Sequence, residues 1–176
     1  YLKEGVNFPR IEVPIDKTVE GIGKNNLQYQ LENFDQEELS IHFQSLRIPV
    51  EEHWLLLKVR PNYLRLYGRE SLSSFHHQSL IARRVQHFHV ETSTAIVFSP
   101  TSFQQMAGLV CYYNTSHWMY LHLMGDEDSQ SKYLQILVCD NFEMKEVLED
   151  PIDVSTHTKI HLGVRWNGGE IQFQYA

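Results

Sequence analysis

Cys111 lies in the stretch FQQMAGLVCYYNT (103–115), inside an apolar run that is followed by two tyrosines. A cysteine nucleophile needs a base within hydrogen-bond reach and a lowered thiol pKa, which a helix N-terminus or a nearby cation can provide. The neighbouring residues supply neither. We therefore interpret Cys111 as a small apolar side chain in a core strand, and Gly108 as a position where another backbone approaches closely.

Three potential metal ligands, His87, His89 and Glu91, follow one another in HFHVE at the spacing that places them on one face of a strand. Ten histidines are scattered through the chain, and this trio has no fourth ligand or supporting partner nearby in sequence. We favour solvated strand residues over a zinc site. The adjacent His76 and His77 are weaker candidates, because neighbours on a strand point to opposite faces.

Other short motifs also have ordinary interpretations. GDEDS (125–129) lacks the ligand register and the distant glutamate of an EF-hand, which favours an acidic turn over a calcium loop. Asn114-Thr115-Ser116 has the form of a glycosylation sequon, which we interpret as coincidence because no secretory signal is visible. The sequence contains no GxSxG, no Gly-rich phosphate loop and no HExxH.

Carboxylate pairs matter because two of them at a set distance are enough for a glycosidase. Three such groups in this chain lie in polar connections, without the apolar neighbours that raise a pKa for general-acid work. We interpret them as solvated loop charge and predict no catalytic residue. The pairs are Glu37 with Glu38, Glu51 with Glu52, and Asp126 with Asp128.

Five aromatic residues together supply about as much aromatic surface as one face of a core should need, or more. Most of them are expected in the core. The alternatives are a platform for a sugar ring and a face for another domain. The residues concerned are Phe75, Tyr112, Tyr113, Trp118 and Tyr120.

The composition of the chain limits which kinds of fold and function are possible for it. The 176 residues are 42% hydrophobic and 12% aromatic, which predicts one folded domain with a sizeable core. The net charge is -7 and no basic stripe interleaves with aromatics, which argues against nucleic-acid binding. The sequence has no apolar run near the roughly 20 residues that cross a bilayer. Its start, YLKEGVNFPR, has neither the charged n-region nor the apolar h-region of a signal peptide, and a leader of a longer parent would lie outside this sequence. Two cysteines, Cys111 and Cys139, predict buried reduced thiols. We expect a soluble cytoplasmic protein.

From residue 41 the sequence changes to short runs with period two, broken by turn residues. A hairpin is predicted between 53–59 and 63–68, with Pro61 and Asn62 in its turn, and another across NGG (167–169). No segment shows a helical stripe. About ten strands without crossover helices predict an all-β antiparallel sandwich or jelly roll. The remaining predicted strands are 79–90, 94–100, 106–114, 118–124, 133–141, 159–166 and 170–176.

Both ends of the sequence suggest a larger parent. Residues 1–30 carry Pro9, Pro14, Gly21 and Gly23 with little periodicity and are predicted to be a linker that follows another domain. The run 170–176 would leave an apolar strand near a sheet edge, which proteins normally cover. We therefore expect that closing strands of the sandwich follow Ala176.

Two long blocks carry a family resemblance: WLLLKVRPNYLRLYGRESLSSFHHQSLIARR (54–84) and FQQMAGLVCYYNTSHWMYLHL (103–123), followed by ILVCDN (136–141). From about Phe43 onward the chain resembles the C-terminal β-sandwich of glycoside hydrolase family 43 β-xylosidases. The resemblance implies a concanavalin A-like jelly roll over residues 31–176. It would follow a five-bladed catalytic propeller, in an inverting enzyme that releases xylose from the non-reducing ends of xylo-oligosaccharides.

The resemblance also bears on the site residues. It places all three acidic catalytic residues in the propeller, so none is carried over to this chain, and it leaves the substrate-binding residues unknown. A sandwich loop that closes the family's active-site pocket is expected after Ala176. The implied partners are the propeller of the same parent chain and further copies in a homo-oligomer. No cofactor is expected, although a calcium ion on the sandwich rim, with Asp35 as a ligand, stays an alternative.

Two functions remain open. In the first, the domain packs on the propeller, helps to shape its active site and is inactive alone. In the second, it is an autonomous carbohydrate-binding module that stacks aromatics of a sheet face on xylan, for which the fold alone is weak evidence. The parent's preference between xylosides and arabinofuranosides is left open as well.

Overall fold

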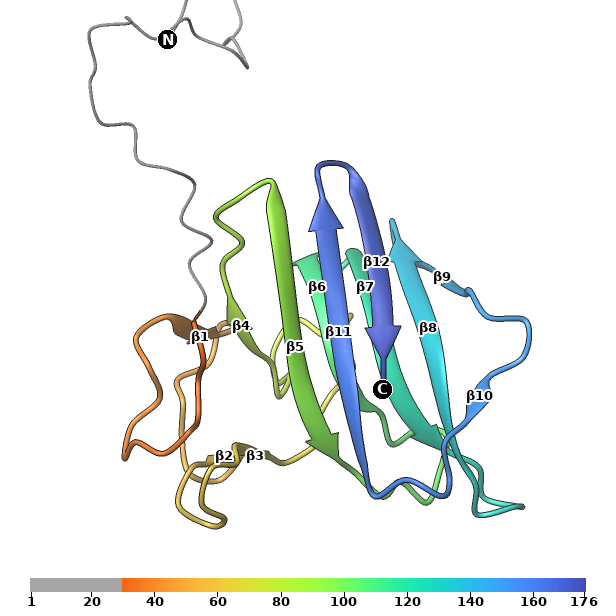
Figure 1. The fold of residues 1–176 in the computed structure, drawn as a ribbon, viewed down its shortest axis with the longest axis horizontal. Helices are drawn as coiled ribbons and strands as arrows, with labels where there is room; N and C mark the ends of the chain where they lie inside the picture. Colours follow the sequence, from red (N-terminus) through yellow and green to blue (C-terminus); the bar gives the residue numbers. More distant parts are fainter. Residues whose placement is uncertain (1–29) are drawn as a thin grey trace, which may run out of the picture. The chain divides into compact units, whose positions relative to one another are not determined.

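The computed structural model describes residues 30–176 (Figure 1). The chain divides into two units, Tyr1–Glu32 and Asn33–Ala176, and the second contains every described strand. The linker predicted over residues 1–30 lies outside the described residues except for Gln30. The described part of the chain contains no helix, and therefore no helix that is long and apolar enough to cross a membrane. The all-β prediction is confirmed.

The larger sheet has five strands, all antiparallel, in the order β10-β8-β7-β6, with β9 also paired to β8. It is built from two long hairpins whose central strands alternate apolar side chains, as the sequence predicts. At the bulge near Tyr113 the register between β6 and β7 shifts by one residue. The strands are β6 (Ala107–Asn114), β7 (His117–Gly125), β8 (Lys132–Asp140), β9 (Glu143–Glu146) and β10 (Ile152–Asp153).

The smaller sheet has the order β12-β11-β5 and is also antiparallel. Its strands are β5 (His89–Val97), β11 (Lys159–Asn167) and β12 (Glu170–Tyr175). β11 and β12 are joined across Gly168 and Gly169, and Gly168 has a φ of 61°, which glycine adopts at no steric cost. The hairpin predicted at NGG is confirmed.

Two short pairs precede these sheets: β1 (Phe43–Ser45) with β4 (Ile81–Arg83), and β2 (Leu55–Leu56) with β3 (Arg65–Leu66). The predicted hairpin of 53–59 with 63–68 therefore exists only as a two-residue ladder. Its turn is as predicted, because the Tyr63 amide donates to the Arg60 carbonyl at 3.2 Å and Asn62 has a φ of 61°. Trp54 and Leu55 are buried, so this segment is held by side-chain packing more than by a ladder.

The strands predicted at 79–90 and 94–100 are wrong in their bounds. β4 ends at Arg83, residues 84–88 form no strand, and β5 then runs without a break from His89 to Val97. The middle of β5, Glu91 to Ala95, is exposed and its first four residues are polar, so it carries no hydrophobic alternation. It is a strand because all nine residues pair with β11.

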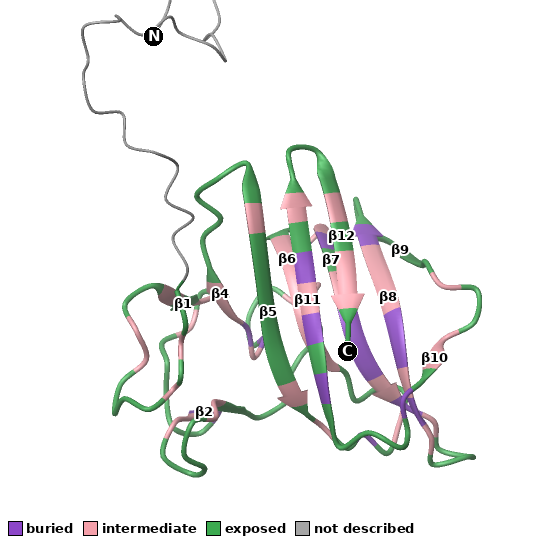
Figure 2. Cartoon of the chain, in the orientation of Figure 1, coloured by how far each residue is buried: buried purple, intermediate pink, exposed green. Residues whose placement is uncertain are grey.

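The core lies between the two larger sheets. Leu121 and Leu123 of β7 and Leu134 of β8 face Ile160 and Leu162 of β11. In Figure 2 the buried positions follow β7, β8 and β11, whereas β5 is mostly exposed. Two stacked antiparallel sheets with an apolar layer between them form the predicted sandwich. Val154 completes the buried cluster, and Ile96, Phe98, Leu109, Ile136, Ile152 and Phe173 pack around it.

Candidate functional site

Cys111 lies in β6, where the sequence places it. Burial raises the pKa of its thiol, which is opposite to what a nucleophile needs. Both cysteines are free: Cys111 is half-buried and Cys139 is buried, with its thiol donating to the Ser116 carbonyl at 3.5 Å. A Cβ added to Gly108 would lie 2.0 Å from the Leu121 carbonyl oxygen, which confirms the predicted close backbone approach.

The proposed zinc ligands are not assembled into a site. His87 precedes β5, while His89 and Glu91 lie within it, and all three are exposed. The Glu91 carboxylate is 3.4 Å from the Arg165 guanidinium of the neighbouring strand. Among residues 30–176, no three His, Cys, Asp or Glu side chains lie where they could hold a metal ion. Solvated side chains remain the better interpretation.

His76 and His77 lie in a loop and not on a strand, so the expectation of opposite strand faces does not apply to them. Their rings are 6.2 Å apart and tilted by 50°. The Glu70 carboxylate accepts a hydrogen bond from the Ser74 hydroxyl and another from the His77 backbone amide. These bonds lower the pKa of Glu70 and fix the loop.

The acidic stretch after β7 is a turn stabilised by its own side chains. Asp126 accepts hydrogen bonds from the Asp128 amide at 3.0 Å and from the Ser129 hydroxyl at 2.7 Å. The Ser129 bond is the main reason why the pKa of Asp126 is lowered. The favoured acidic turn agrees with this geometry.

The other predicted carboxylates are exposed and have separate partners. Glu37 is 3.8 Å from the Lys58 ammonium, and Glu51 is 3.0 Å from His53. Glu38 and Glu52 are exposed as well. None of these environments is the apolar pocket that keeps a carboxylic acid protonated near neutral pH.

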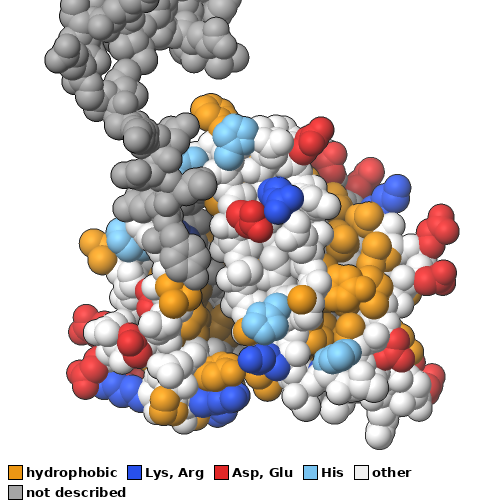
Figure 3. All heavy atoms as spheres, in the orientation of Figure 1, with side chains coloured by type: hydrophobic (Ala, Val, Ile, Leu, Met, Phe, Trp, Pro, Cys, Tyr) orange, Lys and Arg blue, Asp and Glu red, His pale blue; other side chains and the backbone are white. Residues whose placement is uncertain are grey.

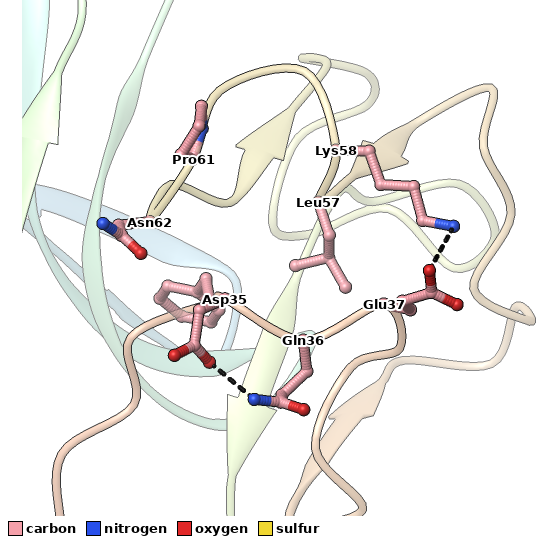
Figure 4. Close-up of a pocket in the computed structure, with 8 residues that line it drawn as sticks. Asp35, Gln36, Glu37, Leu57, Lys58, Pro61 and Asn62 are labelled. Carbon is pink, nitrogen blue, oxygen red and sulfur yellow. Dashed lines mark hydrogen bonds and ion pairs between the residues drawn. The ribbon is translucent and has the colours of Figure 1, made fainter.

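A small pocket of about 270 Å³ lies beside Asp35 (Figure 4). The Asp35 carboxylate accepts a hydrogen bond from the side-chain amide of Gln36 at 2.9 Å, and Asn62 lies on the opposite wall. The two acidic side chains, Asp35 and Glu37, already have Gln36 and Lys58 as partners. A calcium ion at Asp35 stays a prediction. The lining residues are Phe34, Asp35, Gln36, Glu37, Leu57, Lys58, Pro61 and Asn62.

The predicted aromatic set divides between the core and the surface. Trp118 is buried at 5% exposure, and Tyr120 stacks on His122 with their ring centroids 5.0 Å apart. Burial raises the pKa of Tyr120 and lowers that of His122. Tyr112 is half-buried, and its hydroxyl donates to the Leu72 carbonyl at 3.4 Å. Only Phe75 and Tyr113 of the five are exposed.

Three exposed aromatic residues, Phe75, Tyr113 and Phe142, belong to the region where the β6–β7 and β8–β9 turns meet. We call this region the turn end (Tyr113–His117, Asp140–Phe142 and Phe75). The Phe75 and Phe142 ring centroids are 6.5 Å apart, and the Tyr113 ring stands edge-on to His117 at 6.3 Å. His117 Nε2 is 3.3 Å from an Asp140 carboxylate oxygen, which links the turns. The sequon residue Asn114 is part of this turn, since its side-chain oxygen accepts from the Ser116 amide at 2.9 Å.

Sequence reasoning missed Phe142 and its contact with Phe75. The predicted strand ended at residue 141, so Phe142 had no assigned element. The signal was present: Asp140-Asn141 is a dipeptide that favours a turn, and the residue after it in a two-residue hairpin takes a positive φ.

The outer face of the smaller sheet offers no aromatic platform. Opposite the buried Ile160 and Leu162, β11 presents His161 and Arg165, and β12 presents Gln172. Figure 3 shows this face over β5 and β11 as mostly neutral polar surface and backbone, with hydrophobic side chains gathered beyond β12.

Comparison with known proteins gives a consistent family. Residues 31–176 match the model of the β-xylosidase C-terminal concanavalin A-like domain of glycoside hydrolase family 43. A β-xylosidase of Bacillus subtilis is 42% identical over 148 residues, which is 84% of this chain and 28% of that protein. A xylosidase/arabinosidase of Humicola insolens is 33% identical over 139 residues, which is 76% of this chain and 25% of that protein.

A solved structure agrees with these sequence matches. The xylan β-1,4-xylosidase of Bacillus halodurans superposes with a TM-score of 0.82 at 36% identity, covering 98% of this chain and 33% of that one. The present chain therefore spans between a quarter and a third of the length of these relatives.

Proposed function

The chain belongs to the family of β-xylosidase C-terminal concanavalin A-like domains, and from this premise we propose that it is the non-catalytic sandwich domain of a family 43 β-xylosidase. In this proposal it packs on the catalytic propeller of the same parent chain and helps to shape the active site. The observation that carries the proposal is the family match over residues 31–176, combined with relatives that are three to four times longer than the matched part.

The chemistry of the described residues supports a non-catalytic role. The acidic side chains singled out as candidates are solvated and separately engaged, and Cys111 has a raised thiol pKa. A glycosidase needs two carboxyl groups held at a set distance across a sugar, with one of them kept protonated by its surroundings. We therefore assign bond cleavage to the parent's other domain.

The parent's activity is part of the same proposal. It hydrolyses xylo-oligosaccharides from the non-reducing end with inversion, acts in the cytoplasm and forms a homo-oligomer. The names of the relatives favour a xyloside substrate, and the Humicola protein keeps an arabinoside open.

Isothermal titration tests the proposal. The 176-residue chain is titrated with xylo-oligosaccharides and, separately, with the catalytic part of the parent, and its turnover of a nitrophenyl xyloside is measured. We expect binding to the catalytic part only, and no turnover. Saturable heat with the sugar and none with the catalytic part would identify a carbohydrate-binding module, and turnover by this chain alone would also contradict the proposal.

A further inference from the structure

We propose that the turn end is the surface on which the catalytic domain of the parent chain docks, with the Phe75 and Phe142 rings as its anchors. The proposal rests on the proposed function and adds the place of contact. Both rings are more than half exposed, at 56% and 54%, and Tyr113, whose ring contacts His117 of the adjoining turn, is exposed at 84%. Three exposed aromatic side chains at one end of a sandwich form the kind of patch that marks an interface.

The backbone of Phe142 is the first reason. Asp140 pairs with Glu143, so Asn141 and Phe142 form a two-residue turn, with φ values of 51° and 67°. The second position of such a turn normally holds glycine, because a bulky residue at positive φ is strained. Phe142 recovers little by burial in this domain, since it remains 54% exposed. Strained residues are typically retained at binding sites, and a partner that covers the ring would offset the strain.

The rigidity of the two anchors is the second reason. The Phe142 amide donates to the Ser116 carbonyl at 3.4 Å, so one turn is fastened to the other. At the other anchor, the Arg47 guanidinium donates to the Phe75 carbonyl at 3.2 Å and to the Ser74 carbonyl at 3.5 Å. The backbone of each anchor is therefore fixed before binding, which reduces the conformational entropy lost when a partner docks.

The chemistry of the patch favours a polypeptide over a sugar. Phenylalanine has no group that can hydrogen-bond a sugar hydroxyl, and the next outward side chain on β9, Met144, is apolar and exposed. The histidine between the two turns is already engaged: His117 Nδ1 is 2.8 Å from the Ser116 hydroxyl, and Nε2 faces Asp140. At Phe75 and Phe142 a xylose unit would meet ring faces that offer no hydrogen bond to its hydroxyls.

The size of the relatives indicates which polypeptide this is. Two thirds of the solved Bacillus halodurans chain, and a larger share of the Bacillus subtilis protein, lie outside the part that this chain matches. In the proposed parent most of this remainder is the catalytic domain, which is tethered to the sandwich in every copy. At that effective concentration it is the partner that meets the turn end most often.

Thiol labelling in the full-length parent tests the contact. Tyr113→Cys places a reporter at the turn end and leaves both anchors intact, while Ser93→Cys, Phe103→Cys and Val147→Cys place matched reporters on other exposed surfaces. We expect Tyr113→Cys to react about tenfold more slowly in the parent than in the 176-residue chain, and the other three to react equally in both.

Adding Phe75→Ala and Phe142→Ala in the parent should restore rapid labelling of Tyr113→Cys. The buried Cys139 should stay unreactive, which shows that the sandwich is folded. Protection of another reporter in place of Tyr113→Cys would overturn the docking surface and leave the proposed function standing. Equal labelling of all four reporters in both chains would overturn both. Protection of Tyr113→Cys in the isolated chain by xylotriose, or by raised protein concentration, would instead identify a sugar or a second copy and overturn the proposal.

Discussion

The two larger sheets of this sandwich differ in what their outer faces do. The five-stranded sheet buries residues on both sides: Leu121 and Leu123 face the core, and Trp118 and His122 are buried on the other face. The three-stranded sheet buries only its inner side and presents polar residues outward. The difference teaches that the outer face of the five-stranded sheet buries part of the aromatic surplus, such as Trp118, whereas the outer face of the three-stranded sheet carries no aromatic platform for a sugar.

The largest effect is expected from truncating the shared core. Leu123→Ala removes a fully buried side chain from β7 and should lower the free energy of unfolding by about 2 to 5 kcal/mol. Ser93→Ala, on the exposed face of β5, should leave the free energy of unfolding within about 0.5 kcal/mol of that of the unsubstituted chain. Denaturant unfolding measures both. A similar loss for the two variants would remove the distinction between the layers.

A matched pair of glycines sharpens the comparison between sheets. Gly108→Ala would place its Cβ 2.0 Å from the Leu121 carbonyl oxygen, so β6 and β7 must move apart, at a cost of roughly 1 to 3 kcal/mol. At Gly163 of β11 the nearest atom lies 3.6 Å away, and alanine there should be neutral or stabilising by about 0.4 to 1 kcal/mol. Thermal unfolding of the two variants gives the contrast. Equal destabilisation would mean that close approach is not specific to the five-stranded sheet.

The buried histidine should make stability depend on pH. Burial lowers the folded-state pKa of His122 below its ordinary value of 6.5. The unfolded chain therefore binds a proton first, and stability should fall as the pH drops below about 6.5. Replacing His122 with Gln should flatten this part of the profile relative to the wild-type chain. An unchanged slope in the variant would show that other groups cause the dependence.

The smallest effect is expected from the surface ion pair of the three-stranded sheet. Glu91 and Arg165 are 3.4 Å apart and both are more than half exposed. Glu91→Gln should change the free energy of unfolding by at most about 1 kcal/mol, and by less at high salt. Urea unfolding at two salt concentrations checks this. A larger, salt-independent loss would mean that this face is less solvated than its exposure indicates.

Much of the fold follows from local pattern. The alternation in 118–124 predicts β7, and the NGG turn predicts the last hairpin, because period two and positive φ are properties of a few neighbouring residues. The pattern fails for β5, which is polar and exposed in the middle, and for β9, whose four residues are all exposed. β5 is held by pairing with β11, which is distant in sequence, and β9 by a two-residue hairpin with β8. Neither pairing leaves a hydrophobic signal.

For the candidate sites, the sequence mainly predicted which residues do not form a metal or catalytic site. The spacing of His87, His89 and Glu91, the carboxylate pairs and Cys111 could be weighed against solvated or packed alternatives without coordinates. The turn end could not be predicted, because its residues come together only when the β6–β7 and β8–β9 hairpins align and the loop before Gln78 brings Phe75 to Phe142.

The sequence by itself determined which side chains share a strand face, where the glycine turn falls and that the candidate catalytic motifs are missing. Only the tertiary structure decided which faces are covered. Tyr120 and Tyr113 are both aromatic residues of adjoining strands, yet the first is packed on His122 and the second is open to solvent. The physical reason is that side-chain alternation is a local property of the backbone, whereas burial depends on which distant segment lies against that face.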